Sequence, residues 1–277
     1  MWSFPWRRRK ETAEKEDAAQ NAPMKRLLSY QVANLQGIGT RARQEDSFAF
    51  ANVLDVTEIR QKGLLAAVAD GMGGMKDGQR ASETAVFSLK AGFAAMDREA
   101  DLSVQLCDSV YKAGEQINQL LGGDGGSTLV ACVIYQEQLY YASVGDSFLY
   151  LKRDGQLLRL NREHTYRNQL YLEAIRSGSM IPGPANTDPE RAALTQFLGM
   201  DQMSEIDCFR RPLPLKDGDV LLICSDGVGG VLTEEKLLGC LERKTPAEAC
   251  AGMEEEIRRQ NRQYQDNYTA LAIYCSY

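Results

Sequence analysis

The sequence predicts a domain of the α+β class, in which antiparallel sheets lie beside separate groups of helices. Apolar residues recur at helical spacing over residues 79–96 and 102–121, so two consecutive helices are expected there. Four short apolar runs follow between residues 127 and 160, with brief turn-like breaks between them. Close hairpins imply antiparallel pairing, and helices grouped beside such a block favour an α+β layered domain over a wound βαβ sheet.

The two predicted helices each have one apolar face. In the first helix this face consists of residues three or four positions apart, namely Ala81, Ala85, Leu89, Phe93 and Met96. In the second helix the apolar face is assigned to Val104, Cys107, Tyr111, Ile117 and Leu121. Two more helical patterns, near residues 233–242 and 246–260, are expected towards the end of the chain.

Three further apolar runs predict buried strands. Residues 63–70 and 219–226 each end in an acidic residue, and residues 268–275 close the chain. Asp154 and Gly155 separate two of the runs in the strand-rich block, and this pair is typical of a two-residue hairpin turn.

Composition limits the possible functions. The 277 residues are 44% hydrophobic, which is enough for a sizeable core, and suit one large domain or two small ones. The net charge is -6 and the body of the chain has no basic stripe, so no nucleic-acid partner is expected. An anionic substrate would therefore need local positive charge from a few arginines or from bound cations.

The cysteines and the apolar runs indicate a cytoplasmic protein. Seven cysteines are scattered along the chain without a C-x-x-C pair, so neither a disulfide framework nor a structural zinc site is expected. No apolar run approaches the ~18 residues of a membrane-spanning helix, and no secretory signal pattern is present. We expect a monomer without a transmembrane segment.

The chain is expected to divide into a short tail and one main domain. Residues 1–24 are polar and basic after an aromatic start, and we interpret them as a flexible tail; a membrane-surface or docking arm is the alternative. Residues 25–277 form the expected domain. Within it, residues 166–200 are rich in proline and are predicted to be an irregular flap.

Acidic residues stand where several apolar runs begin or end. These residues are Glu45, Asp46, Asp70, Asp226 and Asp266. An Asp-Gly pair is also a common turn, and Asp124-Gly125, Asp154-Gly155 and Asp217-Gly218 are interpreted as turns alone. Spacing by itself leaves the turn and functional interpretations of Asp70 and Asp226 open.

Six short motifs occur in a fixed order along the chain. They are GTRARQEDSF (39–48), VADGMGG (68–74), GGSTLVA (125–131), VGDS (144–147), LICSDGVGG (222–230) and DNYTALAI (266–273). Together they resemble the bacterial branch of the PP2C (PPM) family of metal-dependent protein serine/threonine phosphatases. The resemblance covers residues 30–276 and implies an αββα sandwich, two antiparallel sheets with helices outside.

The resemblance also implies a site with two Mn²⁺ or Mg²⁺ ions. Asp70 looks like the bridging ligand, and Asp226 and Asp266 look like ligands of one ion. Glu45 and the Gly71 carbonyl look like ligands of the other ion, direct or through water.

Two more residues acquire expected roles from the resemblance. Asp46 looks like a ligand or an acceptor for bound water. Arg41 is similar to the arginine that grips the substrate phosphate. Asp70, Asp46 and Arg41 are the expected catalytic residues.

Elementary chemistry agrees with a cation site. Two carboxylates ~4 Å apart repel by about 4 kcal/mol at an effective dielectric constant of ~20, so a cluster of them needs a cation or a proton. Oxygen ligands favour Mg²⁺ or Mn²⁺, and the single histidine, His164, excludes a histidine-rich zinc site. Ser225 and Cys224 lack the sequence context of a nucleophile, and residues 122–126 (GGDGG) lack that of a phosphate-binding loop.

The chain also departs from the family pattern. Met72 stands where some relatives have a histidine, and His164 is assigned to packing and hydrogen bonding. Phe148 replaces an arginine after the GDS motif. Gly230 replaces an acid that helps to hold a third ion with Asp146, so a third ion is doubtful, and Asp146 is either a weak ligand or a turn residue.

The expected activity is hydrolysis of phosphoserine and phosphothreonine on proteins, the products of a serine/threonine kinase, by a metal-activated water. A catalytically weak PP2C-like regulatory scaffold and a phosphatase of small metabolites are the alternatives. The retained acids and Arg41 argue against the scaffold, whereas the sequence does not discriminate between protein and metabolite substrates.

Overall fold

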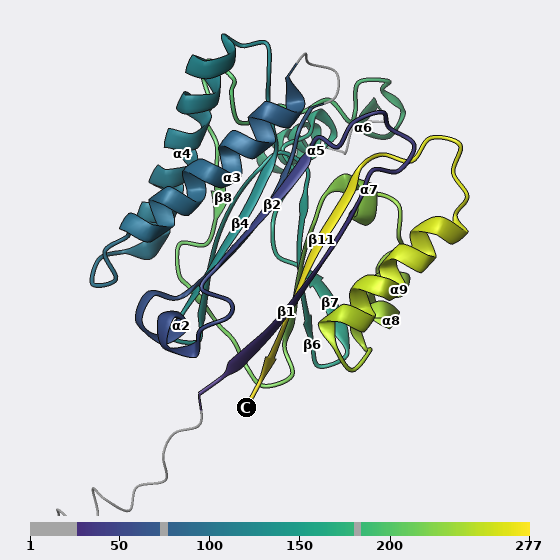
Figure 1. The fold of residues 1–277 in the computed structure, drawn as a ribbon. Coiled ribbons are helices and arrows are strands. Elements are labelled where there is room, and N and C mark those ends of the chain that lie inside the picture. The colour runs from purple at the N-terminus through teal and green to yellow at the C-terminus, as the bar shows by residue number, and fades with distance from the viewer. Residues whose placement is uncertain (1–26, 73–76, 180–183) are drawn as a thin grey trace, which may run out of the picture.

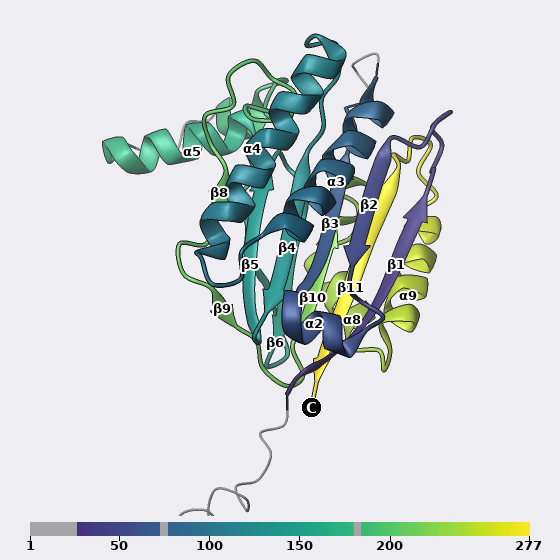
Figure 2. The same ribbon diagram turned by 60° about the vertical axis from the view of Figure 1, so that its left-hand side comes forward.

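A computed structural model describes residues 27–72, 77–179 and 184–277. Two antiparallel sheets pack face to face between two layers of helices, as Figures 1 and 2 show. The expected αββα sandwich is therefore confirmed. The proposed tail at 1–24 lies outside the described residues.

The first sheet contains the two ends of the described chain. Its strand order is β1 (Ser29–Gly37), β11 (Tyr268–Ser276), β10 (Val220–Cys224), β6 (Phe148–Arg153) and β7 (Gln156–Arg159). Every neighbouring pair is antiparallel. Strand β1 was not predicted from the sequence, and it pairs over its whole length with β11, from Ser29 opposite Ser276 to Gly37 opposite Tyr268.

The second sheet is built mainly from consecutive strands. In order, its strands are β2 (Asp46–Ala51), β3 (Leu64–Asp70), β4 (Leu129–Tyr135), β5 (Gln138–Val144) and β8 (Asp207–Cys208), with β9 (Leu213–Pro214) also paired to β5. The short helix α2 (Val56–Lys62) joins β2 to β3. This connection brings the start of β2 beside the end of β3.

Helices cover the outer face of each sheet. Helices α3 (Gly78–Ala95) and α4 (Leu102–Leu121) pack on the second sheet, and α8 (Glu234–Leu241) and α9 (Pro246–Arg259) pack on the first. A third apolar layer lies between the two sheets. Central strands are therefore buried on both faces: in β3, Leu64 faces the other sheet and Leu65 faces the helices. This explains why the strand sequences are continuously apolar instead of alternating.

The predicted face of the second long helix was partly wrong. Val104 is 56% exposed and Tyr111 is also exposed, whereas Leu106 is fully buried. The buried stripe of α4 follows Leu102, Leu106, Val110, Ala113, Ile117 and Leu121. Both sets recur at helical spacing, so periodicity alone did not reveal which stripe faces the sheet.

The candidate flap at 166–200 is more regular than predicted. Its first part is helix α5 (Tyr166–Ser177), capped at its start by the Thr165 side chain and ended by Gly178 at a φ of 65°. The helix forms because no proline or glycine interrupts those residues. A single turn, α6 (Pro184–Thr187), follows, and Pro182 and Gly183 lie outside the described residues.

The predicted two-residue hairpin turn is confirmed. Asp154 and Gly155 form the two-residue turn between β6 and β7, with φ values of 52° and 73°. All seven cysteines are free thiols, and five of them are buried. In the described ranges, no helix is both long enough and apolar enough to cross a membrane.

Substitution on α4 tests the corrected face. Leu106→Ala leaves a cavity under the helix and should lower the free energy of unfolding by about 2–5 kcal/mol. Val104→Ala on the exposed side of the same helix should change it by less than about 0.5 kcal/mol. Urea unfolding of the two variants measures the difference, and equal losses would contradict the assignment.

Candidate active site

The candidate site lies where strand ends of the two sheets meet. Asp46 is the first residue of β2 and pairs with Asp70, the last residue of β3, so register alone places these two acids side by side. In the other sheet, Asp226 follows β10 and begins the single turn α7 (Asp226–Gly229), and Asp266 precedes β11. The antiparallel pairing of β10 with β11 brings both to the same end of that sheet.

A hydrogen-bond chain joins the two sheets at this end. The Ser225 hydroxyl donates to Asp46 Oδ2 at 2.8 Å and accepts from the backbone N–H of Thr269 at 3.0 Å. Ser225 is fully buried, so this link is shielded from water. Sequence analysis assigned no role to Ser225, because its partner Asp46 lies 179 residues away along the chain.

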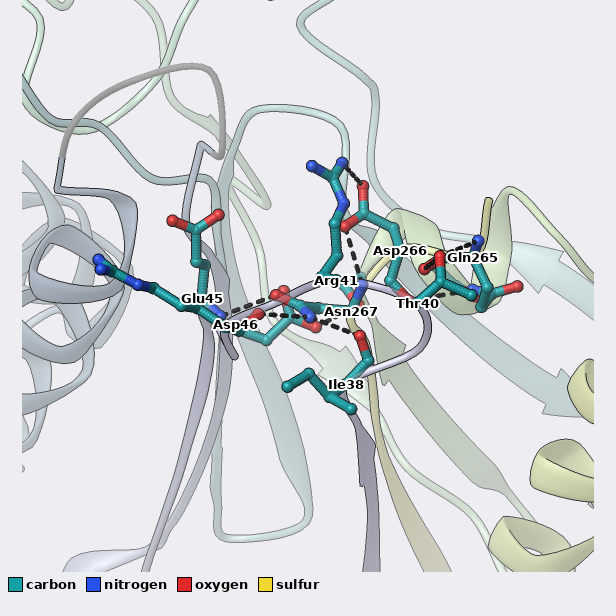
Figure 3. Close-up of polar contacts among 11 residues, drawn as sticks. Ile38, Thr40, Arg41, Glu45, Asp46, Gln265, Asp266 and Asn267 are labelled. Carbon is teal, nitrogen blue, oxygen red and sulfur yellow. Dashed lines mark hydrogen bonds and ion pairs between the residues drawn. The ribbon is translucent and has the colours of Figure 1, made fainter. Parts of the chain in front are cut away.

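Asn267 fixes the loop that carries Arg41 and Glu45. Its Oδ1 accepts from the Glu45 backbone N–H at 2.7 Å, and its Nδ2 donates to the carbonyls of Ile38 at 2.9 Å and Arg43 at 3.0 Å (Figure 3). The side chain is 4% exposed, and all of these partners are backbone groups. Asn267 is therefore a positioning residue that sequence analysis missed, although it lies inside a quoted motif.

Two glycines allow the backbones of the site to approach closely. A Cβ on Gly227 would lie 1.8 Å from the Asn267 carbonyl oxygen. A Cβ on Gly71 would lie 2.3 Å from the Gly78 carbonyl oxygen and 2.6 Å from that of Glu45. Any larger residue at these positions would push the acid-bearing loops apart. Gly73 and Gly74, which belong to the same VADGMGG motif as Gly71, lie outside the described residues.

Two hydroxyls hold the backbone of Asp70. Ser127 Oγ donates to the Asp70 carbonyl at 3.0 Å, and Thr128 Oγ1 accepts from the Asp70 N–H at 3.2 Å. The backbone N–H of Thr128 also donates to the Asp70 carbonyl at 2.8 Å. These bonds fix Asp70 at the centre of the cluster.

The acids are electrostatically coupled. Burial, together with the charges of Asp226 and Asp266, raises the pKa of Asp46 to about 6, although hydrogen bonds from Thr269 and Ser225 oppose the rise. Burial and three neighbouring aspartates raise the pKa of Asp70 well above its usual value. Burial and the charge of Asp266 raise the pKa of Asp226 as well, although its interaction with the Asp70 carboxyl opposes the rise.

Asp146 belongs to the edge of the same cluster. It lies between β5 and β6, after Gly145, which has a φ of 99°. Burial and the charges of Asp226 and Glu163 raise the pKa of Asp146 to about 7. Gly230 adds no carboxylate, and its N–H donates to the Asp226 carbonyl at 2.8 Å. The role of Asp146 as a weak third-ion ligand stays a prediction.

The residues at the site suit divalent cations. Within the described ranges, no three acidic, histidine or cysteine side chains stand close enough together to hold a cation as they are. Yet among the described residues Asp46 Oδ1 is buried without a hydrogen-bond partner, and burial and neighbouring aspartates raise the pKa of Asp70. Carboxylate and carbonyl oxygens are the donors that Mg²⁺ and Mn²⁺ prefer.

Arg41 supplies the positive charge at the rim. Its guanidinium donates to Asp266 Oδ2 at 2.5 Å, with side chains 49% and 41% exposed. Figure 3 shows Arg41 and Glu45 extending from one loop towards the same side. A pocket of about 540 Å³ adjoins this rim and is lined in part by Arg41, Asp226 and Asp266. The structure thus brings the predicted arginine and acids to one end of the sandwich.

The departures from the family pattern are accommodated by packing. His164 is buried, its Nδ1 accepts from the Gly145 N–H at 3.2 Å, and burial lowers its pKa. The expected packing and hydrogen-bonding role of His164 is therefore confirmed. Phe148 packs against Gly229, and the Arg159 guanidinium lies 4.1 Å from the centre of the Phe148 ring.

Relatives in sequence are bacterial phosphatases. The chain is 30% identical over 197 residues to the serine/threonine phosphatase Stp of Listeria innocua, covering 68% of this chain and 76% of that protein. It is 32% identical over 178 residues to the protein phosphatase PhpP of Streptococcus pneumoniae, covering 61% of this chain and 69% of that one.

Solved structures show the same fold. The PPM Ser-Thr phosphatase MsPP of Mycobacterium smegmatis, in complex with cacodylate, aligns with a TM-score of 0.69 at 29% identity, over 88% of this chain and 97% of that one. The catalytic domain of the phosphatase PstP, in complex with two manganese ions, aligns with a TM-score of 0.70 at 26% identity, over 91% and 100%. The family model for protein phosphatase 2C matches residues 38–260. The chain belongs to the protein phosphatase 2C family.

Proposed function

We propose that this protein is a metal-dependent phosphatase of phosphoserine and phosphothreonine on proteins. The observation that carries the proposal is the coupled cluster of buried acids beside Arg41, assembled from the ends of both sheets. Membership of the family, and relatives named serine/threonine phosphatases, support the same activity. The seven free thiols support a reducing, cytoplasmic location.

Two Mn²⁺ or Mg²⁺ ions are the proposed cofactors. Asp70 would bridge them, Asp226 and Asp266 would hold one, and Glu45 with the Gly71 carbonyl would hold the other. When bound, such a pair lowers the pKa of a shared water and neutralises charge on the phosphate. The two-manganese structure of PstP supports this choice of cofactor.

Asp46 is proposed to accept the proton of the attacking water. Ser225 occupies Asp46 Oδ2, which leaves the buried Oδ1 as the free acceptor. A ligand role of the same carboxylate is compatible with this assignment. The Ser225 hydroxyl then orients Asp46 by holding one of its two oxygens.

Arg41 is proposed to hold the phosphate. Its planar guanidinium can donate two parallel hydrogen bonds to phosphate oxygens, and it lies on the pocket rim next to the acids. Asp266 accepts a hydrogen bond from this guanidinium. The ion pair keeps Arg41 oriented towards the site.

Metal-dependent hydrolysis is the first test. The protein should release phosphate from a phosphothreonine peptide and from an aryl phosphate only with Mn²⁺ or Mg²⁺, and Asp70→Asn and Asp226→Asn should abolish both activities. Manganese should also raise the melting temperature of the wild type more than that of either variant, because ligand binding stabilises the folded state. Absence of activity and of a thermal shift would favour the scaffold alternative, and turnover of sugar phosphates without peptides would favour a metabolite phosphatase.

A second prediction concerns the phosphate clamp. Arg41→Ala should lower kcat/KM by about 10²–10³, since one charged donor to the transition state is removed. Arg43→Ala provides the matched control, because Arg43 lies in the same loop and only its carbonyl is engaged by Asn267. Equal losses in the two variants would show that the phosphate-holding role is misassigned.

A third prediction concerns pH. Since the pKa of Asp46 is raised to about 6, the cation-free folded state holds a proton that the unfolded state releases. Stability from this group is therefore present below the folded pKa and lost as the pH rises through it. In chelator, the free energy of unfolding of Asp46→Asn relative to wild type should rise by about 1 kcal/mol between about pH 5 and about pH 7.5. Urea titrations at both pH values measure the difference in free energy of unfolding between Asp46→Asn and the wild type. A difference that does not change with pH would contradict the raised pKa of Asp46.

A further inference from the structure

We infer that the pocket beside the acid cluster is a subsite for an acidic residue that flanks the phosphorylated residue, with Arg262 as its ion-pair partner. This inference rests on the proposed function and names a feature of its substrates. The pocket measures about 540 Å³ and reaches from Arg41 and the acids to Arg262 and Tyr264. A peptide whose phosphate is held at Arg41 would therefore have neighbouring residues within this pocket.

Three segments distant in sequence form the pocket walls. They are the loop after β1, the turn α7 with the residues that follow it, and residues 262–266. Thr40 and Gln265 connect the first and third walls: the Thr40 N–H donates to the Gln265 carbonyl at 2.8 Å, and the Gln265 N–H donates to Thr40 Oγ1 at 3.0 Å. These reciprocal bonds fix the distance between the phosphate clamp and Arg262.

The Gln265 side chain connects the third wall to the second. It is buried, and its Nε2 donates to the carbonyls of Gly227 at 3.0 Å and Asp266 at 3.2 Å. The Nε2 bond to Gly227 therefore holds the second and third walls together.

Charge indicates what the pocket accepts. On the preceding helix α9, Arg258 and Arg259 each pair with glutamates three or four residues earlier. In the described ranges Arg262 has no ion pair or side-chain hydrogen bond. The acids that line the pocket, Asp226 and Asp266, are assigned to the cations. Arg262 is therefore an unneutralised positive charge in the pocket of a protein whose net charge is -6.

Two guanidiniums in one pocket suit two anionic groups. Arg41 is assigned to the phosphate, so Arg262 is available for a carboxylate on the same peptide. Tyr264 beside it is 82% exposed and offers an aromatic surface to the peptide chain. A peptide with an aspartate or glutamate near its phosphorylated residue would supply one anionic group for each of the two guanidiniums.

Matched peptides test the subsite. Phosphothreonine peptides carrying Asp, Ala or Lys at successive positions on either side are compared by kcat/KM, in manganese and at low salt. At one or more positions the wild type should favour Asp over Lys by about twofold to fivefold, and added salt should reduce the ratio. Arg262→Ala should remove the preference, Arg262→Lys should retain part of it, and Arg262→Glu should reverse it in favour of Lys.

The controls separate this inference from the proposed function. Arg60→Ala alters an exposed arginine on α2, which lies at the opposite end of the sandwich (Figure 1), and should keep the wild-type preference. Failure of the wild type to hydrolyse either aryl phosphate or peptides would overturn the proposed function. The subsite alone would be overturned if the wild type hydrolyses aryl phosphate and all peptides but shows no preference for a flanking residue. It would also be overturned if Arg262→Glu leaves such a preference unchanged. Reversal cannot arise from misfolding, so it would establish the role of Arg262.

Discussion

Repulsion among carboxylates is the constraint on which this end of the molecule depends. The fold places Asp46, Asp70 and Asp226 at the meeting point of two sheets, where burial removes the water that would screen them. Burial and neighbouring aspartates raise the pKa of Asp70, and Arg41 pairs with Asp266 at the rim. The proposed divalent ions would relieve this repulsion, because a cation neutralises charge among the carboxylates.

The surrounding polar side chains mostly serve to hold backbone in place. Asn267 binds three backbone groups of one loop, Ser127 and Thr128 hold Asp70, and Ser225 connects the sheets through Asp46. Such a framework keeps the acids together against their repulsion. Hydrogen bonding and apolar packing of the whole sandwich thus offset the cost of assembling the site.

Much of this arrangement was readable from the sequence, and the failures have physical causes. Continuous apolar runs that end at Asp70 and Asp226 predicted buried strands. The Asp154-Gly155 pair predicted the hairpin between β6 and β7, because both residues tolerate positive φ. The apolar face of α4 was misassigned because apolar residues occur on two sides of that helix. Asn267 and Ser225 were missed because their partners are separated from them by up to 229 and 179 residues, which no local pattern reveals.

The pairing of β1 with β11 has a consequence for biosynthesis. The strand that starts at Ser29 has its partner at Tyr268–Ser276, so this sheet has a gap between β1 and β10 until β11 has left the ribosome. Asp266 and Asn267 arrive with that same last strand. Contacts so distant in sequence form late in folding. A nascent chain therefore lacks both the structural closure and the final acid, and hydrolytic competence coincides with completion of the fold.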